Sequence, residues 1–273
     1  MNGKMLREKL HAGERVYGTL IVSDSPRWPA VVNHLGLDFV FIDTEHATLD
    51  RSQAAWMCQT YAALGLAPVV RIPSPDPYQA CMALDGGAQG IIVPYTETPE
   101  QVRQIAGAVH LRPLKGAREQ DALAGRVKLE PGLADYLENY NKNNLLIVNI
   151  ESMPAMKALD DILAVPGLDA VLVGPHDLTI NLGIPEQYQH PAYIAAVDEI
   201  IQKARARGIG AGVHAIYPFA SQHELRWAKM GANLIIHQGD LITFRYAMCT
   251  ALDELKQALG DQPRAGESEG VNI

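Results

Sequence analysis

Short apolar runs alternate with longer helical patterns along most of the chain, from Tyr17 to about Leu259. Such alternation is typical of repeated strand–helix units that build a parallel sheet. Several runs, FVFI, GIIV, LLIV and AVLV, contain no polar residue, as expected of parallel strands that are covered on both faces. The predicted strands are Tyr17–Val22, Leu37–Ile42, Ala67–Arg71, Gly90–Val93, Leu145–Ile150, Ala170–Val173, Gly210–Val213 and Leu234–His237.

Eight regularly spaced units favour closure into a barrel over an open doubly wound sheet, and no G-x-G-x-x-G motif follows the first strand. The length of 273 residues is close to the roughly 250 residues of a typical (β/α)8 barrel. A composition with 48% hydrophobic and 20% charged residues supports one large core. We therefore predict a single-domain α/β protein with a (β/α)8 TIM-barrel fold over residues 1–259.

Capping residues mark helix ends between these strands. Asp50 with Gln53, and Thr98 with Gln101, have the spacing of N-cap and N3 partners, and Pro99 suits a first helical position. Helices are predicted to stop before glycines that adopt a positive φ, namely Gly65, Gly208 and Gly231.

Three segments fall outside the repeat. The stretch Asn2–Lys9 is predicted to form a short amphipathic helix that plugs the bottom of the barrel. Residues 110–132 are polar and rich in Arg, Lys and Gly, so we interpret them as a long βα loop that borders the active site or contacts another subunit. The C-terminal tail, 260–273, is predicted to be flexible.

Charge and cysteine content narrow the partners and the compartment. A net charge of −8 argues against binding to nucleic acid or to an anionic membrane surface, because both require clustered Lys and Arg. The N-terminal sequence is too polar for a signal peptide, and no apolar run approaches the roughly 20 residues of a membrane span. We expect a cytoplasmic protein with three buried, unpaired thiols: Cys58, Cys81 and Cys249.

Barrel enzymes carry their active sites at the carboxyl ends of the strands, so polar residues there are candidates. Glu151 ends one predicted strand and Asp177 follows the next, which brings their carboxylates together. Oxygen ligands with room for water and substrate favour Mg²⁺ or Mn²⁺, and octahedral Co²⁺ also fits. The alternative is that each carboxylate caps the helix that follows it.

Another group of polar residues follows the second and third predicted strands. Asp43 can hold one nitrogen of His46 and leave the other free as a base, and Glu45 is a second candidate. Arg71 is suited to stabilising an enolate or a substrate carboxylate, and an ion pair with Asp43 or Glu45 is compatible with that role.

The segment VGPHDL supplies a glycine that a ligand can approach closely and a predicted helix start at Asp177–Leu182, whose amides can bind an anion. The other polar residues that follow predicted strands are Ser23, Asp24, His214, Gln238 and Asp240.

Five pieces, IDTEHA, VVRIP, GGAQGIIVP, NIES and VGPHDL, occur in this order at strand ends and resemble the HpcH/HpaI family of class II pyruvate aldolases. The resemblance spans about Val16 to Leu259. It implies a barrel like those of the phosphoenolpyruvate/pyruvate superfamily and a metal-dependent lyase. Such an enzyme reversibly cleaves 4-hydroxy-2-oxo acids to pyruvate, or hydroxypyruvate, and an aldehyde through a metal-stabilised enolate. It further implies a hexamer and a place in the catabolism of aromatic compounds.

By this resemblance, Glu151 and Asp177 would be the metal ligands, and the 2-oxo acid would chelate the ion. Arg71 would steady the enolate oxygen, and His46, paired with Asp43, would activate a water that moves the proton. The substrate carboxylate would lie against Gly174, Pro175, His176 and Asp177.

Four features depart from the family pattern. Asn149 stands where Gln is usual, Thr44 replaces a common Gly, and His176 replaces a small residue. The segment RPLKGAR also differs from the usual Gly-x-Arg-Gly loop, so the sequence does not identify the aldehyde.

Two rival functions are considered. A relative of citrate lyase or malyl-CoA lyase would share the carboxylates and the arginine but bind a CoA thioester, for which the loop 112–126 offers Lys115, Arg118 and Arg126. The compact length and the EHA motif favour the aldolase. A non-catalytic metabolite-binding barrel would be expected to have lost its base and metal ligands, which are all present here.

Overall fold

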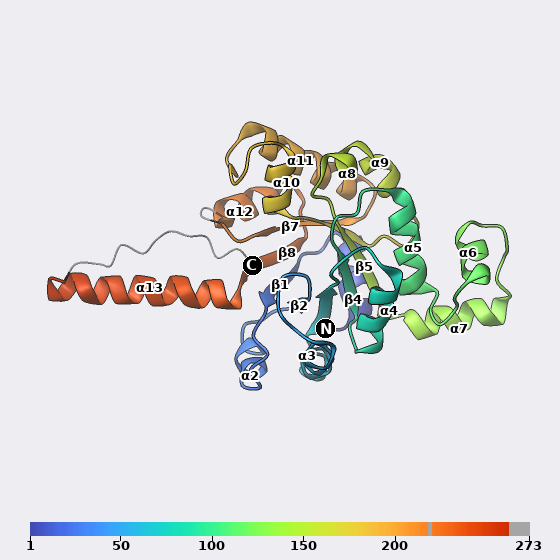
Figure 1. The fold of residues 1–273 in the computed structure, drawn as a ribbon, viewed down its shortest axis with the longest axis horizontal. Helices are drawn as coiled ribbons and strands as arrows, with labels where there is room; N and C mark the ends of the chain where they lie inside the picture. The colour runs from blue at the N-terminus through green and yellow to red at the C-terminus, as the bar shows by residue number, and fades with distance from the viewer. Residues whose placement is uncertain (218–219, 262–273) are drawn as a thin grey trace.

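The computed structural model describes residues 1–217 and 220–261 and contains a closed barrel of eight parallel strands in chain order (Figure 1). The predicted (β/α)8 TIM-barrel fold is therefore confirmed, and every predicted strand end lies within two residues of an observed one. The strands are β1 (Val16–Ile21), β2 (Phe39–Asp43), β3 (Ala67–Arg71), β4 (Gly90–Val93), β5 (Leu145–Asn149), β6 (Ala170–Val173), β7 (Gly210–Ala215) and β8 (Leu234–Gly239).

Helices surround the barrel and connect successive strands. They are α1 (Gly3–Ala12), α2 (Trp28–Val32), α3 (Arg51–Ala63), α4 (Pro77–Asp85), α5 (Pro99–His110), α6 (Ala117–Leu123), α7 (Pro131–Asn141), α8 (Met153–Lys157), α9 (Leu159–Ile162), α10 (Pro175–Asn181), α11 (Pro191–Ala206), α12 (Ala220–Met230) and α13 (Asp240–Leu259). Among the residues that the structure describes, no helix combines the length and apolar content needed to cross a lipid bilayer.

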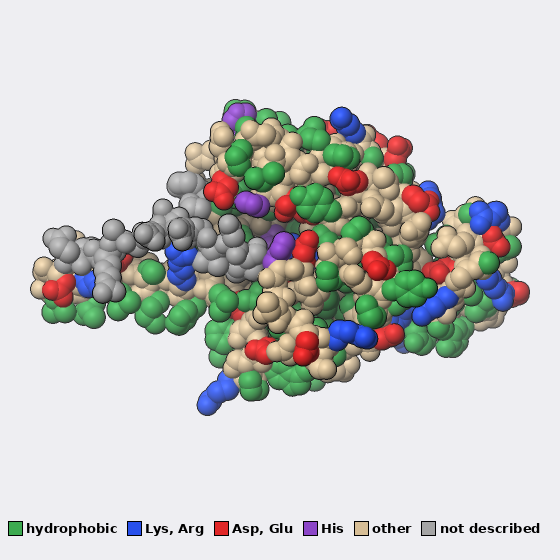
Figure 2. All heavy atoms as spheres, viewed as in Figure 1, with side chains coloured by type: hydrophobic (Ala, Val, Ile, Leu, Met, Phe, Trp, Pro, Cys, Tyr) green, Lys and Arg blue, Asp and Glu red, His purple; other side chains and the backbone are tan. Residues whose placement is uncertain are grey.

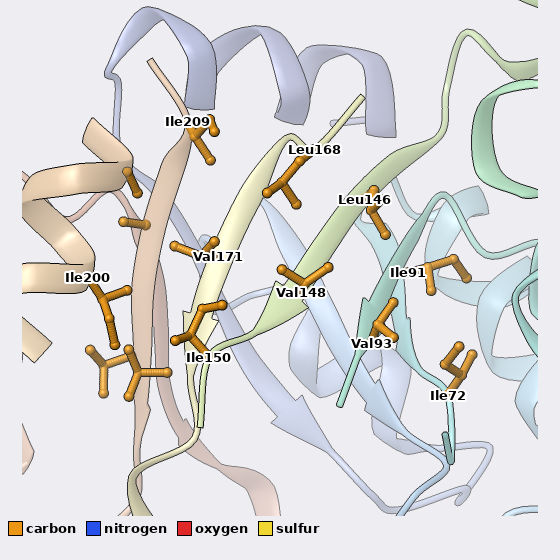
Figure 3. Packing of buried hydrophobic residues seen from close by; sticks show 14 of the residues in the cluster. Ile72, Ile91, Val93, Leu146, Val148, Ile150, Leu168, Val171, Ile200 and Ile209 are labelled. Carbon is orange, nitrogen blue, oxygen red and sulfur yellow. The ribbon is translucent and has the colours of Figure 1, made fainter. Parts of the chain in front are cut away.

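The apolar core has two layers because successive strand side chains point to opposite faces of the sheet. Phe41, Ile92 and Ile147 fill the barrel interior. Their neighbours point outward into the layer between strands and helices, where Figure 3 shows Val93 and Val148 among the packed side chains. This alternation fixes which strand-end residues face the barrel mouth.

Helix α1 closes the bottom of the barrel, as the sequence predicted. Leu6 and Leu10 are fully buried and belong to the interior cluster. Asn2 caps the helix by accepting a hydrogen bond from the amide of Met5. A β-carbon at Gly3 would lie 1.8 Å from the carbonyl oxygen of Asn143, so only glycine permits this close approach of the helix to the barrel.

The predicted helix caps are also confirmed. Reciprocal capping boxes join Asp50 to Gln53 at the start of α3 and Thr98 to Gln101 at the start of α5. The glycines that follow three helices adopt φ values of 78°, 74° and 120°, at Gly65, Gly208 and Gly231 respectively.

Residues 110–132 do not form the expected βα loop. They follow α5, include α6, and lead through α7 into β5, so they belong to a helix-to-strand connection. His110 contacts the carbonyl of Gly167 and the carboxylate of Asp169, just before β6 begins. This connection therefore starts at the amino-terminal end of the strands, opposite the mouth, and the prediction that it borders the active site is wrong.

The thiols and the C-terminal tail differ in how far the structure describes them. Cys58 is buried as expected, whereas Cys81 is partly exposed and Cys249, on α13, is exposed. Residues 262–273 of the predicted flexible tail lie outside the described residues.

Helix α13 extends away from the barrel instead of packing against it (Figure 1). One stripe of this helix presents apolar side chains to solvent, which Figure 2 shows along its length. The stripe has helical spacing and consists of Phe244, Met248, Leu252, Leu255 and Leu259. The outer face of β1 and β8 is correspondingly open, with Tyr17 46% exposed on β1 and His237 exposed on β8.

Candidate active site

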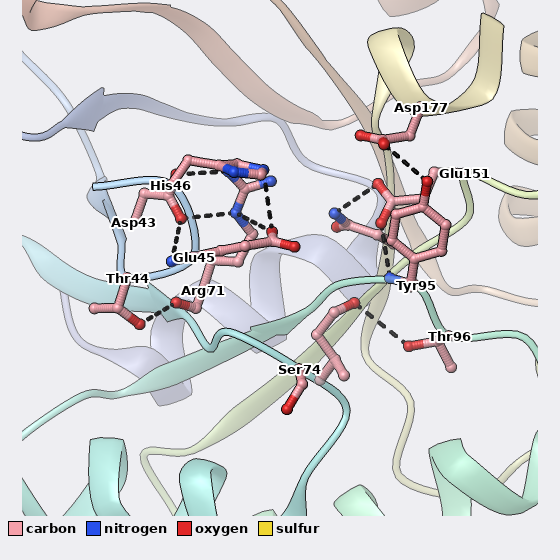
Figure 4. Close-up of polar contacts among 12 residues, drawn as sticks. Asp43, Thr44, Glu45, His46, Arg71, Ser74, Tyr95, Thr96, Glu151 and Asp177 are labelled. Carbon is pink, nitrogen blue, oxygen red and sulfur yellow. Dashed lines mark hydrogen bonds and ion pairs between the residues drawn. The ribbon is translucent and has the colours of Figure 1, made fainter. Parts of the chain in front are cut away.

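Polar side chains from neighbouring strand ends converge at the carboxyl-terminal mouth of the barrel (Figure 4). Asp43 ends β2 and Arg71 ends β3, and the two residues are register partners in the sheet. Glu151 follows β5, and Asp177 lies in the first turn of α10 after β6.

Arg71 is the centre of one half of the site. Its Nε and Nη2 donate to the two carboxylate oxygens of Asp43 at 2.8 and 2.6 Å, and Nε also lies 3.1 Å from Glu45 Oε2. Burial alone would raise the pKa of Asp43, but the hydrogen bonds and charge of Arg71 outweigh it and hold that pKa below its usual value. The guanidinium also lies 5.4 Å from the ring centroid of Phe41. Its position is therefore fixed by carboxylates on one side and an aromatic ring on another.

The expected pairing of Asp43 with His46 is not what the structure contains. The second interaction of the Asp43 carboxylate is with the backbone amide of Glu45, at 3.0 Å, and His46 Nε2 instead lies 3.6 Å from Glu45 Oε2. Burial raises the pKa of Glu45, against the charge of Arg71, so this carboxyl is easier to protonate than an exposed one. Glu45 thus lies between the guanidinium of Arg71 and the imidazole of His46 at the mouth.

Glu151 is almost completely buried and accepts hydrogen bonds from neutral donors. The Tyr95 amide donates to Oε1 at 2.7 Å, and Asn149 Nδ2 donates to Oε2 at 3.0 Å. Burial raises the pKa of Glu151 to about 7. Oδ1 of Asn149 is buried and has no hydrogen-bond partner among the described residues. The carboxyl and amide oxygens together make this corner electron-rich.

Asp177 is joined to Glu151 through Tyr95, a residue that the sequence reasoning missed. The Tyr95 hydroxyl donates to Asp177 Oδ1 at 2.9 Å, while its backbone amide holds Glu151. Tyr95 lies two residues after the end of β4, so its position at a strand end could have marked it as a candidate. It was passed over because tyrosine is a less common metal ligand or acid–base group than histidine or a carboxylate. Burial raises its pKa to about 12, so it remains a hydrogen-bond donor at neutral pH.

The alternative that the two carboxylates cap helices is not supported. Ser152 caps α8 by accepting from the amide of Ala155, and the N-cap of α10 is Gly174. Helix α10 begins at Pro175, two residues before its predicted start, which places Asp177 inside its first turn.

The segment from Gly174 to His176 shapes the space around Glu151. A β-carbon at Gly174 would lie 2.1 Å from Glu151 Oε2, so the glycine is required for this close packing. Pro175 has no amide hydrogen, which removes one of the donors expected for a substrate carboxylate. His176 is directed to Glu186, at 3.8 Å on the exposed side.

The donor set fits a hard divalent ion. Glu151 and Asp177 supply carboxylate oxygens, and a buried carboxylate that is bonded only to neutral donors gains from a nearby cation. Within the described residues, no three His, Cys, Asp or Glu side chains form a metal-binding group. Any bound ion would therefore need further oxygen ligands from substrate and water, as Mg²⁺ often does.

Comparison with known proteins gives one consistent family. The model of the HpcH/HpaI aldolase/citrate lyase family matches residues 17–235. The 2-keto-3-deoxy-L-rhamnonate aldolase of Salmonella gallinarum is 31% identical over 250 residues, which are 92% of this chain and 92% of that protein.

Solved structures of similar fold include members of the same family. An HpcH/HpaI aldolase from Desulfitobacterium hafniense superposes with a TM-score of 0.80 at 26% identity, covering 94% of this chain and 99% of the other. The citrate synthase SbnG superposes with a TM-score of 0.79 at 28% identity, with coverages of 94% and 99%.

Proposed function

The chain belongs to the HpcH/HpaI aldolase/citrate lyase family, and on that premise we propose that it is a metal-dependent aldolase. Its reaction is the reversible cleavage of a 4-hydroxy-2-oxo acid to pyruvate, or hydroxypyruvate, and an aldehyde. The relative from Salmonella gallinarum supports this substrate class, because 2-keto-3-deoxy-L-rhamnonate has its oxo group at C2 and a hydroxyl group at C4.

The observation that carries the proposal is the arrangement of Glu151, Asp177 and Arg71. Two carboxylates, one of them buried, lie at the same mouth as the partly buried guanidinium of Arg71, whose positive charge acts on Glu151. A 2-oxo acid presents a carboxylate oxygen and a carbonyl oxygen, which are suited to coordinating a cation that Glu151 and Asp177 would hold.

A divalent ion such as Mg²⁺, Mn²⁺ or Co²⁺, held by Glu151 and Asp177, would act as a Lewis acid on the C2 oxygen of the substrate. Arg71 contributes a permanent positive charge to the enolate oxygen that forms when the C3–C4 bond breaks. Asp43 fixes the guanidinium before substrate binds, because both carboxylate oxygens are bonded to it. Preorganised charge of this kind needs no rearrangement during the reaction.

Proton transfer is assigned to His46 and Glu45. The His46 side chain is 43% exposed and contacts Glu45, so it can reach the substrate hydroxyl through a water. In cleavage, His46 takes the proton of the C4 hydroxyl through that water, the electrons of the C3–C4 bond form the enolate, and a proton returns to C3. The aldehyde and the 2-oxo acid then leave.

The CoA-lyase alternative is less favoured by the structure. Lys115, Arg118 and Arg126 lie in the connection that starts at the amino-terminal end of the barrel. Arg118 is paired with Glu130, and Arg126 with Asp121. A CoA phosphate would bind near the mouth, whereas the connection that carries these side chains starts at the opposite end of the barrel.

We also propose that the protein is a homo-oligomer in which α13 of one copy covers the open face of β1 and β8 of another. Within residues 1–217 and 220–261, the apolar stripe of α13 and the outer face of these strands are both exposed surfaces of the same chain. The hexamer implied by the family resemblance is compatible with such an exchange of α13 between copies.

Light scattering after size exclusion should show an oligomer that dissociates in the double variant Leu252→Asp/Leu255→Asp. It should not dissociate in Leu35→Asp, which changes an exposed leucine outside α13. A monomeric wild-type protein would refute the exchange.

Pyruvate release tests the proposed reaction. The metal-stripped protein should be incubated with 2-keto-3-deoxy-L-rhamnonate and with shorter 4-hydroxy-2-oxo acids, and pyruvate followed with lactate dehydrogenase and NADH. We expect cleavage of at least one acid that requires Mg²⁺, Mn²⁺ or Co²⁺, is lost with EDTA, and falls by at least a hundredfold in Glu151→Gln. Absence of cleavage for the whole series with all three ions would count against the aldolase.

A further inference from the structure

Tyr95 makes a connection that none of the roles described above requires. Its backbone amide donates to Glu151 Oε1 at 2.7 Å, and its side-chain hydroxyl donates to Asp177 Oδ1 at 2.9 Å. A single residue, Tyr95, therefore holds two carboxylates that follow β5 and β6 (Figure 4).

The backbone of Tyr95 is in an uncommon conformation. Its φ is 43°, and only two other non-glycine residues of the described chain have a positive φ, Glu186 and Gln238. Bulky residues rarely adopt this region, and such conformations persist where the surroundings determine them. Here the two hydrogen bonds at opposite ends of the same residue are the surroundings that fix it.

The two bonds leave the carboxylates able to bind a cation. A carboxylate has about four lone-pair sites, so each oxygen that accepts a hydrogen bond can still accept a second partner. The phenol donates to Oδ1 of Asp177, and none of the described residues donates a hydrogen bond to Oδ2. Tyr95 thus restrains Asp177 without occupying both of its oxygens.

We propose that Tyr95 is a positioning residue that sets the separation and orientation of Glu151 and Asp177 for a divalent cation. The proposal rests on the metal site of the proposed function. The backbone amide fixes Glu151 whatever the side chain is, whereas the phenol fixes Asp177, so the two contributions can be separated by substitution.

Manganese binding tests this role without any turnover. The full-length protein is stripped of metal and titrated with Mn²⁺, and free Mn²⁺ is measured by electron paramagnetic resonance. Tyr95→Phe removes only the phenol and should weaken Mn²⁺ binding by about tenfold, the range for outer contacts of metal ligands. Tyr78→Phe removes a phenol from a side chain that is 72% exposed and should bind Mn²⁺ like the wild type. The metal-free thermal midpoint of Tyr95→Phe should match that of Tyr78→Phe, which a merely structural role would not predict.

A second variant separates the phenol from the ring. Tyr95→Leu also lacks the hydroxyl and should weaken binding as much as Tyr95→Phe. Weakening in Tyr95→Leu alone would assign the effect to ring packing and overturn the proposal, as would unchanged or tighter binding in Tyr95→Phe.

Glu151→Gln distinguishes failure of this inference from failure of the proposed function. If Glu151→Gln loses Mn²⁺ binding while Tyr95→Phe retains it, the metal site stands and the role of Tyr95 is refuted. If Glu151→Gln binds Mn²⁺ like the wild type, the metal site itself is misplaced and the inference falls with it.

Discussion

Substitution of Gly174 by alanine tests how closely the fold constrains Glu151. The backbone of Gly174 has φ −88° and ψ 102°, which alanine adopts without strain, so the effect is purely steric. The added β-carbon would lie 2.1 Å from Glu151 Oε2, whereas real contacts of this type are essentially never below 3.0 Å. The carboxylate or the backbone must therefore move by about 0.9 Å.

A displacement of that size is enough to break a hydrogen bond to Glu151, either from the Tyr95 amide or from Asn149. A hydrogen bond to a charged group contributes roughly 1.5–3 kcal/mol, so the free energy of unfolding should fall by about 2 kcal/mol. Misplacement of a catalytic group by about 1 Å costs on the order of 10²-fold in rate. We therefore expect Gly174→Ala to lower kcat/KM for pyruvate formation by about 10²-fold.

The control is Gly132→Ala, which adds the same methyl group to α7 where nothing lies within 4 Å. Alanine is favoured over glycine inside a helix by roughly 0.5–1 kcal/mol, so this variant should be at least as stable as the wild type and fully active. Steady-state kinetics and urea unfolding measure both quantities. Wild-type activity in Gly174→Ala would refute the argument that Glu151 must stay where it is.

Three further predictions concern the residues around this position. Arg71→Lys should lower kcat by about 10²-fold, because an ammonium group cannot reproduce the two-pronged contact with the buried Asp43 carboxylate; unchanged kinetics would show that a point charge suffices. Asn149→Ala should weaken Mn²⁺ binding by about tenfold in a paramagnetic-resonance titration, because Glu151 Oε2 loses its donor; wild-type affinity would contradict this. Burial lowers the pKa of His214 to about 4 from 6.5. The unfolded chain therefore takes up this proton first, and stability present above pH 6.5 is lost by up to roughly 3 kcal/mol as pH falls towards 4. His214→Phe should flatten that part of the pH profile in urea unfolding, and an unchanged slope would assign it to other groups.

Local patterns were sufficient to predict the barrel. Runs such as Gly90–Val93 and Ala170–Val173 contain only apolar residues and glycine, and both were found with their predicted bounds. Strand ends were less certain where polar residues intervene. The second strand begins at Phe39 and not at Leu37, because Asp38 uses its carboxylate to accept a hydrogen bond from the Tyr17 amide.

The long connection was misplaced for a different reason. Residues 110–132 were predicted to be a βα loop from their polar composition, although the cap formed by Thr98 and Gln101 already predicts a helix before them. Helix α5 ends at His110, so the segment leads to a strand and not from one.

Within the site, strand ends predicted which residues meet but not how they pair. Asp43 has two chemically suitable partners, and its register with Arg71 on the adjacent strand selects the guanidinium over His46. Spacing along the chain does not encode this choice, which depends on side-chain geometry across strands. Tyr95 was missed because its contribution comes from a backbone amide and a phenol, neither of which has a sequence signature as a partner of the Glu151 and Asp177 carboxylates.

Metal-dependent enolisation of pyruvate at this site can be measured as exchange of the pyruvate methyl protons with D₂O, followed by NMR with the metal-stripped protein. Enolisation at this site requires no knowledge of the aldehyde. We expect exchange that depends on added Mg²⁺ or Mn²⁺, disappears with EDTA, and falls to the background rate in Glu151→Gln. Exchange that is absent with every divalent ion, or that persists undiminished in Glu151→Gln, would contradict this expectation.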